Sequence, residues 1–287
     1  MDKIILVHGI NNEGKSEKQI VWEWIGSIGK SLSPSQFERL LEKEIIAPYY
    51  GDILSDFTED SEGNAASAVA QGASDVVTNE VDFYSSFIKE SFGISSSQIE
   101  EELDQQDEAV AQAAYHNRNV IAVMRAAEKL FPNKVEKLLK KLPQAYCYLK
   151  NVNASNAVDE IVAPALAEKP ALIISHSLGT VVTYKLLRET PSSLNHQYIT
   201  LGSPLGIEAV KKSIRPPFIR PDQLSLWYNG GDKDDFVAAG KKLSSCGYEN
   251  VDQENFDIDN GKDDPHAISR YMASDWVSNK VVEILDI

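Results

Sequence analysis

Residues 171–180 read Ala-Leu-Ile-Ile-Ser-His-Ser-Leu-Gly-Thr, and this stretch decides the fold of the chain. Its first four residues, Ala171 to Ile174, are apolar and predict a short buried strand. The polar turn that follows leads into a segment whose apolar residues recur at helical spacing. The stretch therefore predicts a strand, a sharp turn and a helix in direct succession. The apolar residues of the predicted helix are Val181, Val182, Tyr184, Leu186 and Leu187.

The turn holds a serine, Ser177, with a small residue two positions before it and another two positions after it, Ser175 and Gly179. Between a strand and a helix this spacing is typical of a nucleophile elbow, which lifts the central hydroxyl above the sheet. The flanking residues must be small because strand and helix nearly touch there. The helix beginning near Leu178 directs free N–H groups and a partial positive charge at the serine. The alternative interpretation is a tight turn with an incidental serine.

The start of the chain predicts a second buried strand, Lys3–Val7, which runs into His-Gly at positions 8 and 9. Glycine at position 9 lets the backbone approach a ligand closely. A loop at this place in the fold can supply a second N–H donor beside the serine, with Ile10 as first choice and Asn11 as second. The alternative is an ordinary strand-to-helix loop capped by Asn12.

The rest of the chain alternates between strand and helix patterns, which predicts an α/β fold with a mostly parallel central sheet flanked by helices. Its length of 287 residues fits a single domain over 1–287. Further strands are expected at 45–50, 197–201 and 224–228 and within 255–259. Helices are expected at 17–32, 35–44, 146–166 and 267–285.

Residues 55–143 interrupt this alternation and predict a helical insertion. Helical spacing is found over 81–92, 96–114, 119–131 and 134–142. We interpret the insertion as a cap over the site, while a helical layer that only covers the sheet or supports a homodimer is the alternative. The lysine-rich helix from Lys134 is suited to bind phosphate or anionic lipid, although a charged run is more often a solvated face.

The composition limits the classes of partner. A net charge of −15 repels nucleic acid and anionic membrane surfaces, but it still allows a lipid substrate that enters an apolar pocket one molecule at a time. The two cysteines, Cys147 and Cys246, lack metal-type spacing and predict a reducing, cytoplasmic location. No signal peptide is recognised, and no apolar run approaches the ~20 residues of a membrane span. We therefore expect no stable membrane insertion.

A reactive serine needs a histidine to accept its proton and a carboxylate to orient that histidine. These residues are expected in the order serine, acid, histidine, on loops that follow later strands. The loop after the strand at 224–228 offers Asp232, Asp234 and Asp235, and a late loop offers His266. The other histidines fit less well: His8 is expected to be structural, His176 to pack beneath the turn, His116 to lie in the insertion and His196 in a polar loop.

Several motifs recur together in one superfamily. They are His8-Gly9, residues 175–179, residues 202–206, Trp227 to Asn229, Asp235 to Val237 and Pro265-His266. The set resembles the lipase-like α/β hydrolases, and is most similar to the branch of GPI inositol-deacylase-like and lecithin–cholesterol-acyltransferase-like enzymes. The resemblance covers residues 1–54 and 145–287 and leaves out the insertion.

The resemblance implies an α/β-hydrolase fold and a set of site residues. Ser177 matches the nucleophile and His266 the base, while Asp235 matches the acid because it precedes a short gap and a core valine. The N–H groups of Ile10 and Leu178 match the oxyanion hole. Ser203 and Pro204 match a structural turn beside the pocket. Two features depart from the pattern: Ser175 replaces the usual glycine, and the acidic crowding leaves Asp232 or Asp234 as the acid or as part of a cation site.

We expect hydrolysis of a carboxylic ester through an acyl-enzyme, without a cofactor or a metal. The expected substrate is a small-molecule or lipid ester, such as a lysophospholipid, an acylglycerol or a small carboxylic ester. An amidase or thioesterase would use the same three residues. An alternative from another class is a non-catalytic or signalling module that keeps the scaffold and binds a protein partner through the insertion.

Overall fold

A parallel β-sheet forms the centre of the molecule. The structure, a computed structural model, describes residues 1–59, 79–105, 115–190 and 193–287. Within these residues the strands pair in the order β2-β1-β3-β4-β5-β6, and each neighbouring pair is parallel. The predicted α/β fold with a parallel, helix-flanked sheet is therefore confirmed. The strands are β1 (Lys3–Val7), β2 (Glu44–Ile46), β3 (Leu172–His176), β4 (His196–Leu201), β5 (Leu224–Gly230) and β6 (Gln253–Asn255).

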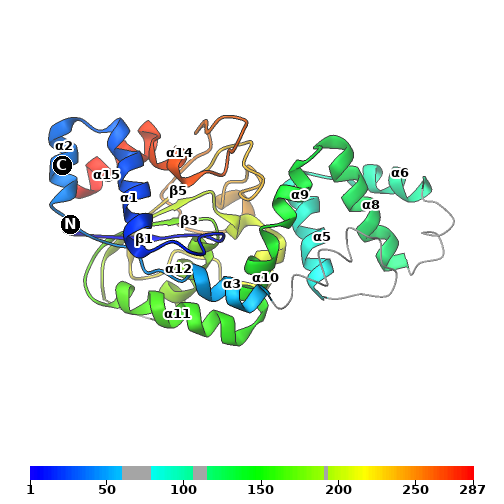
Figure 1. The fold of residues 1–287 in the computed structure, drawn as a ribbon, viewed down its shortest axis with the longest axis horizontal. Coiled ribbons are helices and arrows are strands. Elements are labelled where there is room, and N and C mark those ends of the chain that lie inside the picture. The colour runs from blue at the N-terminus through cyan, green and yellow to red at the C-terminus, as the bar shows by residue number, and fades with distance from the viewer. Residues whose placement is uncertain (60–78, 106–114, 191–192) are drawn as a thin grey trace.

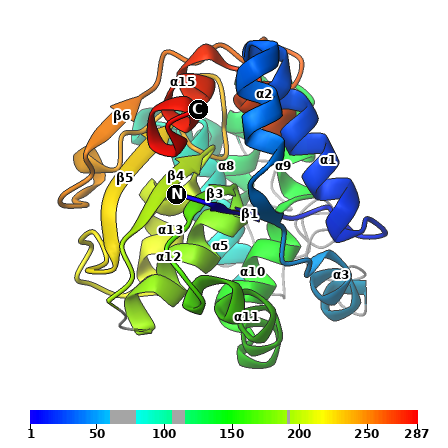
Figure 2. The same cartoon turned by 90° about the vertical axis from the view of Figure 1, so that its left-hand side faces the viewer.

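Helices cover both faces of the sheet (Figure 2). One apolar cluster joins the sheet to α1, α2, α14 and α15, and another joins it to α3, α10, α11, α12 and α13. None of the described helices combines the length and the apolar composition that crossing a membrane requires. The bounds are α1 (Glu17–Ile28), α2 (Pro34–Leu41), α3 (Gly51–Glu59), α10 (Leu142–Lys150), α11 (Val152–Ala167), α12 (Leu178–Glu189), α13 (Glu208–Ile214), α14 (Ile268–Met272) and α15 (Asp275–Leu285).

Successive residues of β1 pack on opposite faces of the sheet. Ile4 and Leu6 join the cluster beneath α1 and α15, whereas Ile5 and Val7 join the cluster beneath α11 and α12. This alternation is the two-residue period of a strand, and both of its faces are buried, as expected for a parallel sheet. The continuous apolar run that predicted β1 therefore reflects burial on two sides.

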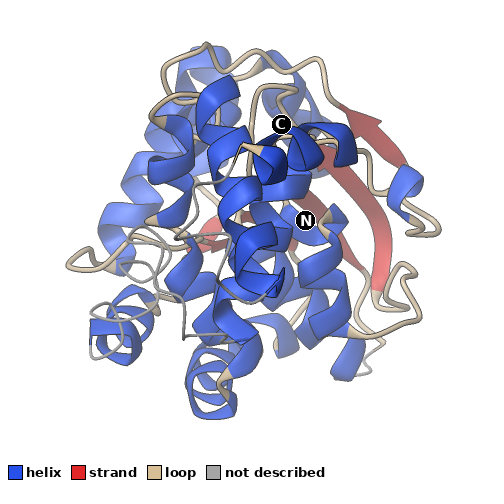
Figure 3. Ribbon diagram, turned by 90° about the vertical axis from the view of Figure 1, so that its right-hand side faces the viewer, coloured by secondary structure: helices blue, strands red, loops and turns tan. Residues whose placement is uncertain are grey.

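A group of helices lies at the end of the molecule opposite the two termini (Figure 1), and Figure 3 shows the molecule from that end. These helices belong to the predicted insertion, of which residues 60–78 and 106–114 lie outside the described residues. Phe87 of this group is buried in the same apolar cluster as Val7 of β1. The helices are α5 (Asn79–Ser91), α6 (Ser96–Asp104), α8 (Tyr115–Leu130) and α9 (Lys134–Leu139).

Two predicted helices are each divided by a cap. The helix predicted over 146–166 is replaced by α10 and α11, which meet at Asn151, and the Asn151 side chain accepts a hydrogen bond from the Asn153 N–H (3.0 Å). The helix predicted over 267–285 divides into α14 and α15, because Ser274 caps α15. An Asn or Ser side chain competes for the backbone N–H groups of a helix, and hydrophobic periodicity does not detect this.

Two predicted strands are misplaced. The strand predicted over 45–50 ends at Ile46, because the chain turns there and the Tyr50 N–H donates to Nε2 of His8 (3.2 Å). The strand predicted within 255–259 lies earlier, at Gln253–Asn255. Both are edge strands of the sheet, and their side chains are partly exposed, so hydrophobicity marks their bounds less well than it marks those of the buried central strands.

The direction of the chain across the sheet reverses between β1 and β3. From β1 the chain adds β2 on one side, and from β3 it adds β4, β5 and β6 on the other. Open α/β sheets bind ligands at the carboxyl ends of their strands at such a switch point. The segments that leave the sheet there are the loop from His8 to Ile10 and the turn at Ser177.

Helix α12 approaches β1 closely at Gly179. A Cβ atom at this position would lie 2.3 Å from the Val7 carbonyl oxygen and 2.4 Å from that of His8. Both are main-chain atoms of the sheet, so no rotation of a side chain can make room. Glycine at position 179 therefore sets how closely the helix that follows Ser177 packs on the strand beside it.

We predict that Gly179→Ala lowers the free energy of unfolding by about 1–3 kcal/mol or more, because the added methyl group forces the main chain of α12 and β1 apart. Gly26→Ala is the matched control. Gly26 lies within α1, and a Cβ there would meet nothing within 4 Å, so the change should stabilise by up to about 1 kcal/mol. Urea unfolding measures the free energy of unfolding of both variants. An equal change in the two variants would contradict the close contact between α12 and β1 at Gly179.

Candidate active site

Ser177 lies at the turn between β3 and α12 with a strained backbone. Its φ is 54° and its ψ is −130°, which lies outside the regions that L-residues ordinarily occupy. Such strain is concentrated at functional sites. The Ser177 N–H donates to the Leu201 carbonyl in β4 (3.1 Å), and the Thr180 hydroxyl donates to the Ser177 carbonyl (2.7 Å). The predicted strand, sharp turn and helix are confirmed, and neighbouring elements hold the turn in place.

Small residues surround this turn. A Cβ at Gly9 would lie 2.6 Å from the Cβ of Ser177, so only glycine lets the loop after β1 pass so close to the serine. Ser175 is fully buried, and its hydroxyl is hydrogen-bonded to that of Thr183 in α12 (2.9 Å). Serine thus replaces the usual glycine at this position because α12 offers a partner for its hydroxyl.

The two proposed oxyanion donors flank Ser177. Ile10 and Leu178 line the same small cavity as the serine. The first N–H groups of a helix have no intrahelical acceptor, and Ser177 caps none of them with its side chain. The Ile10 N–H has no hydrogen-bond acceptor among the described residues. The second choice, the Asn11 N–H, already donates to Oε1 of Gln144 (3.0 Å).

The loop that carries Ile10 is braced from within. The side-chain amide of Asn12 donates to the carbonyls of Gly9 and Ile10, at 3.1 Å each. The Tyr50 hydroxyl donates to the His8 carbonyl. Asn12 therefore fixes the loop itself, and Ser16 rather than Asn12 caps α1, so the alternative interpretation of an ordinary loop capped by Asn12 does not hold. Fixing the carbonyls also fixes the direction of the Ile10 N–H, since each peptide unit is planar.

Asp235 and His266 form a buried hydrogen-bonded pair. His266 Nδ1 lies 2.8 Å from Oδ2 of Asp235. An ionised carboxylate only accepts hydrogen bonds, so Nδ1 carries the proton and Nε2 presents its lone pair. The other carboxylate oxygen accepts the Val237 N–H (2.8 Å). The pair therefore holds the imidazole in the tautomer that a general base requires.

The surroundings of Asp235 keep it ionised. Burial alone would raise the pKa of its carboxyl, but the His266 imidazole and the hydrogen bonds from Tyr271 and Val237 hold that pKa below its usual value. The Tyr271 hydroxyl donates to Oδ2 of Asp235 (2.8 Å). Burial and the Asp235 charge raise the pKa of this phenol well above its usual value, so the phenol stays a donor.

The other two aspartates of the loop differ from Asp235 in burial and in hydrogen-bond partners. Asp232 is buried, and its carboxylate oxygens accept the N–H groups of Asp234 (2.7 Å) and Asn260 (2.6 Å). Asp234 is exposed. Among the three, Asp235 is the one that contacts His266. The described residues contain no group of three or more His, Cys, Asp or Glu side chains placed to hold a metal ion.

His176 supports His266 from behind. The two rings lie 4.5 Å apart between centroids, and Nε2 of His176 donates to the His266 carbonyl (2.9 Å). Burial, followed by repulsion from His266 and Lys141, lowers the pKa of His176 well below its usual value. A neutral imidazole can therefore act as a fixed donor to the backbone of His266, a positioning role that the sequence did not suggest.

Ser177 and His266 line two adjoining hollows. The first, which we call the Ser177 cavity, has a volume of about 20 Å³ and is walled mainly by apolar side chains. The second, which we call the His266 cleft, has a volume of about 490 Å³ and is open to solvent. Leu138, Lys141 and Val237 line both hollows. The Ser177 cavity is lined by Ile10, Phe87, Leu138, Leu142, Ser177 and Leu178, together with neighbouring residues.

Gly202 brings the serine turn and the Asp235–His266 pair together. The Ser177 N–H bonds to the residue before it, and a Cβ at Gly202 would lie 2.9 Å from Oδ2 of Asp235 and 3.1 Å from Nδ1 of His266. Among the described residues, the buried Nε2 of His266 has no hydrogen-bond partner. The Ser177 hydroxyl therefore makes no hydrogen bond to this nitrogen, although the two residues line adjoining hollows; such catalytic hydrogen bonds often form only when substrate is bound.

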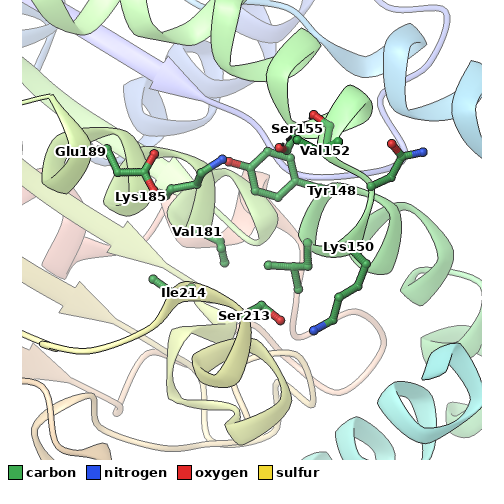
Figure 4. Close-up of a pocket in the computed structure, with 11 residues that line it drawn as sticks. Tyr148, Lys150, Val152, Ser155, Val181, Lys185, Glu189, Ser213 and Ile214 are labelled. Carbon is green, nitrogen blue, oxygen red and sulfur yellow. Dashed lines mark hydrogen bonds between the residues drawn. The ribbon is translucent and has the colours of Figure 1, made fainter.

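A further hollow of about 230 Å³ adjoins the Ser177 cavity through Val181 (Figure 4). Tyr148 and Lys185 lie side by side in its wall (Figure 4). Both donate to the carboxylate of Asp159, at 2.9 Å from the phenol and 2.6 Å from the amino group. Tyr148 and Lys185 are therefore both held by the carboxylate of Asp159.

The ring nitrogens of His8 and His196 are both occupied by hydrogen bonds to the main chain. His196 is buried at the start of β4, not in a polar loop as predicted, and its ring accepts the Ala171 N–H (3.1 Å). His8 is buried between the Gly9 carbonyl and the Tyr50 N–H. The side chain of His116 lies outside the described residues. Among the histidines whose side chains the structure describes, His266 is the one with a carboxylate on one ring nitrogen and an unpartnered nitrogen on the other.

The comparison with known proteins gave no match to this chain. No protein-family model matches the chain, and no curated protein matches it significantly by sequence. The function must therefore be inferred from the geometry of the chain itself.

Buried histidines predict a loss of stability in acid. Burial lowers the pKa of His8 from 6.5 to about 4. Below pH 6.5 the His8 imidazole is protonated in the unfolded chain, whereas in the folded protein it stays neutral down to about pH 4. The free energy of unfolding therefore falls as pH falls through this window. At pH 5 the loss from His8 is about 2 kcal/mol.

Urea unfolding at pH 7.5 and pH 5.0 measures this loss. His176 and His196 also have lowered pKa values, so wild type should lose more than the contribution of His8 alone. His8→Gln should show a smaller loss between the two pH values, by about the same 2 kcal/mol. An unchanged pH dependence in this variant would show that His8 is not buried as a neutral imidazole.

Proposed function

We propose that this protein is a serine hydrolase that cleaves a carboxylic ester through an acyl-enzyme. The observation that carries the proposal is the state of His266. Its Nδ1 is hydrogen-bonded to a buried carboxylate, and its Nε2 is buried and has no partner among the described residues, while a serine with strained backbone geometry lines the adjoining hollow. An unsatisfied buried nitrogen costs about 1–3 kcal/mol, so a fold that keeps one at a hollow adjoining that of a strained serine supports a reaction in which that nitrogen is used.

In the proposed reaction, Oγ of Ser177 attacks the carbonyl carbon of the ester while its proton passes to Nε2 of His266. The carbonyl oxygen becomes an oxyanion, and the N–H groups of Ile10 and Leu178 stabilise it. When the tetrahedral intermediate collapses, His266 gives the proton to the departing alcohol. Asp235 stabilises the imidazolium that forms between these two transfers.

The second half of the reaction repeats the same transfers with water. Water attacks the acyl carbon, its proton passes to His266, and the proton then moves to Oγ of Ser177 as the acid leaves. Tyr271 and His176 hold the Asp235–His266 pair in place throughout, through hydrogen bonds to the carboxylate and to the His266 carbonyl. These two are positioning residues, because neither lines the Ser177 cavity or the His266 cleft.

The proposal includes an α/β-hydrolase fold with residues 55–143 as a cap. Phe87 of α5 and Leu138 of α9 cover the Ser177 cavity, together with Leu142 at the start of α10. With about 20 Å³ of space beside the serine, hardly more than a water needs, an acyl group must displace this cover to enter. The apolar walls favour an apolar acyl group, and exclusion of water strengthens the electrostatic interactions with the oxyanion.

We predict that Ser177→Ala abolishes turnover of a short p-nitrophenyl ester, by a factor of about 10³ or more, because the nucleophile is lost. A fluorophosphonate probe should label wild type at Ser177 and leave the folded variant unlabelled. Retained turnover or labelling in the variant would reject the assignment. Folded wild type that neither turns over the ester nor reacts with the probe would instead support a non-catalytic interaction module.

The amide and thioester alternatives are separated by matched substrates. An ester, a thioester and an anilide with the same acyl group should be cleaved with the ester or thioester ahead of the anilide. The anilide should be the slowest of the three because its nitrogen must be protonated by His266 before the amine can leave. Preferential cleavage of the anilide would favour an amidase.

The choice of acid among three aspartates is tested by a matched pair. Asp235→Asn should lower kcat by about 10³–10⁴, because the amide no longer holds His266 in the required tautomer. Asp234→Asn, which removes the same charge from an exposed side chain of the same loop, should leave kcat within about twofold. Circular dichroism checks that both variants are folded. The reverse ranking would assign the role to Asp234.

A further inference from the structure

The walls of the His266 cleft carry a local excess of positive charge. Five lysines line the cleft, whereas the whole chain has a net charge of −15. The acidic residues that share the wall are Asp263 and Asp264, apart from Asp235, which is buried against His266. Cations therefore outnumber the exposed carboxylates in this cleft. The lysines are Lys134, Lys137, Lys140, Lys141 and Lys262.

Most of these lysines are not neutralised by the protein. Lys140 pairs with Glu136 (2.8 Å), and Lys134 lies over the ring of Phe236 (4.6 Å to the centroid). Among the described residues, Lys137, Lys141 and Lys262 have no carboxylate within 4.0 Å. A cluster of like charges repels itself, and an anion placed among the charges relieves that repulsion.

Lys141 connects this charge to the reacting centre. It lies between α9 and α10, is half-buried, and lines both the Ser177 cavity and the His266 cleft. Its charge also contributes to the lowered pKa of His176, the residue before the serine. A long ammonium side chain in this position can reach a group bound next to His266.

The side of the site on which the lysines lie indicates which part of the ester they contact. His266 gives its proton to the departing alcohol, so the alcohol part must lie on the His266 side during the reaction. The wall of the Ser177 cavity is apolar and close-fitting, and it suits the acyl part. The His266 cleft, at about 490 Å³, lies within the range of ordinary ligand sites.

We propose that the substrate is an ester whose alcohol part carries an anionic group, a phosphate or a carboxylate, and that Lys141 and Lys137 bind this group in the His266 cleft. The inference rests on the proposed hydrolase function. Because the net charge of the chain repels anions at long range, the lysines supply both the attraction and the selectivity near the site.

A matched pair of soluble esters tests the inference. The butyrate ester of 4-hydroxybenzoate is anionic in its alcohol part, and the butyrate ester of methyl 4-hydroxybenzoate is the neutral equivalent. Wild type should prefer the anionic ester by about tenfold or more in kcat/KM at low salt, the factor expected of one charge-assisted hydrogen bond. The preference should fall as salt is raised.

The double variant Lys137→Gln/Lys141→Gln should bring the ratio of the two kcat/KM values close to one. The control is Lys18→Gln/Lys30→Gln, which removes two exposed lysines that do not line the cleft and should leave the ratio as in wild type. A ratio near one in wild type, or a preference that survives in the Lys137/Lys141 variant, would overturn the inference while leaving the hydrolase proposal intact.

A binding measurement separates the two proposals. Ser177→Ala, which should not turn the esters over, should bind the anionic ester more tightly than the neutral one in equilibrium dialysis, and adding Lys137→Gln/Lys141→Gln should remove the difference. Tighter binding of the anion without turnover by wild type would reject the hydrolase proposal and retain the anion site. Equal binding of the two esters would reject the anion site.

A second matched pair identifies the source of the anion. Lysophosphatidic acid and monoacylglycerol with the same acyl chain differ in the phosphate of the alcohol part. A preference for lysophosphatidic acid that needs Lys137 and Lys141 would place the anion on a lipid headgroup. A preference confined to the soluble pair would place it on a small soluble ester, and both results support the inference. A preference for monoacylglycerol would oppose it.

Discussion

The strained turn at Ser177 is the constraint on which the rest of the site depends. A backbone at φ 54° and ψ −130° is kept only where the surroundings over-determine it. Here β4 accepts the Ser177 N–H, and Gly9 and Gly179 let the loop after β1 and the start of α12 press against the turn. The same contacts bring Ile10 and Leu178 to the cavity that Ser177 lines, so the strain and the proposed oxyanion hole would have one origin.

Charge is arranged in two different ways around this turn. Asp235 is buried, and its carboxylate accepts hydrogen bonds from His266, Tyr271 and the Val237 N–H. Lys137 and Lys141 are accessible and unpaired by carboxylates within the described residues. A buried carboxylate whose oxygens all accept hydrogen bonds can orient a base without attracting ligands. An exposed ammonium group without a carboxylate partner attracts anions. We infer that orientation of the base and recognition of the substrate are carried by different residues.

Sequence patterns predicted most of the fold and the local form of the site. Burial on both faces makes β1 and β3 continuous apolar runs, and the small residues around Ser177 are dictated by steric contact within one strand–turn–helix unit. Both signals are local in the chain, so periodicity and spacing reveal them. The divided helices at Asn151 and Ser274 were missed because a capping side chain is a competing hydrogen bond, to which hydrophobic periodicity is insensitive.

The sequence by itself determined the parallel α/β arrangement, the turn at Ser177 and the candidates for its partners. Only the tertiary structure showed that Asp235, rather than Asp232 or Asp234, contacts His266. It alone revealed the hydrogen bonds from Tyr271 and His176 to this pair and the lysines that line the His266 cleft. The physical reason is distance along the chain. These contacts join segments tens of residues apart, and which side chains meet is set by the packing of helices on a shared sheet, which no local pattern encodes.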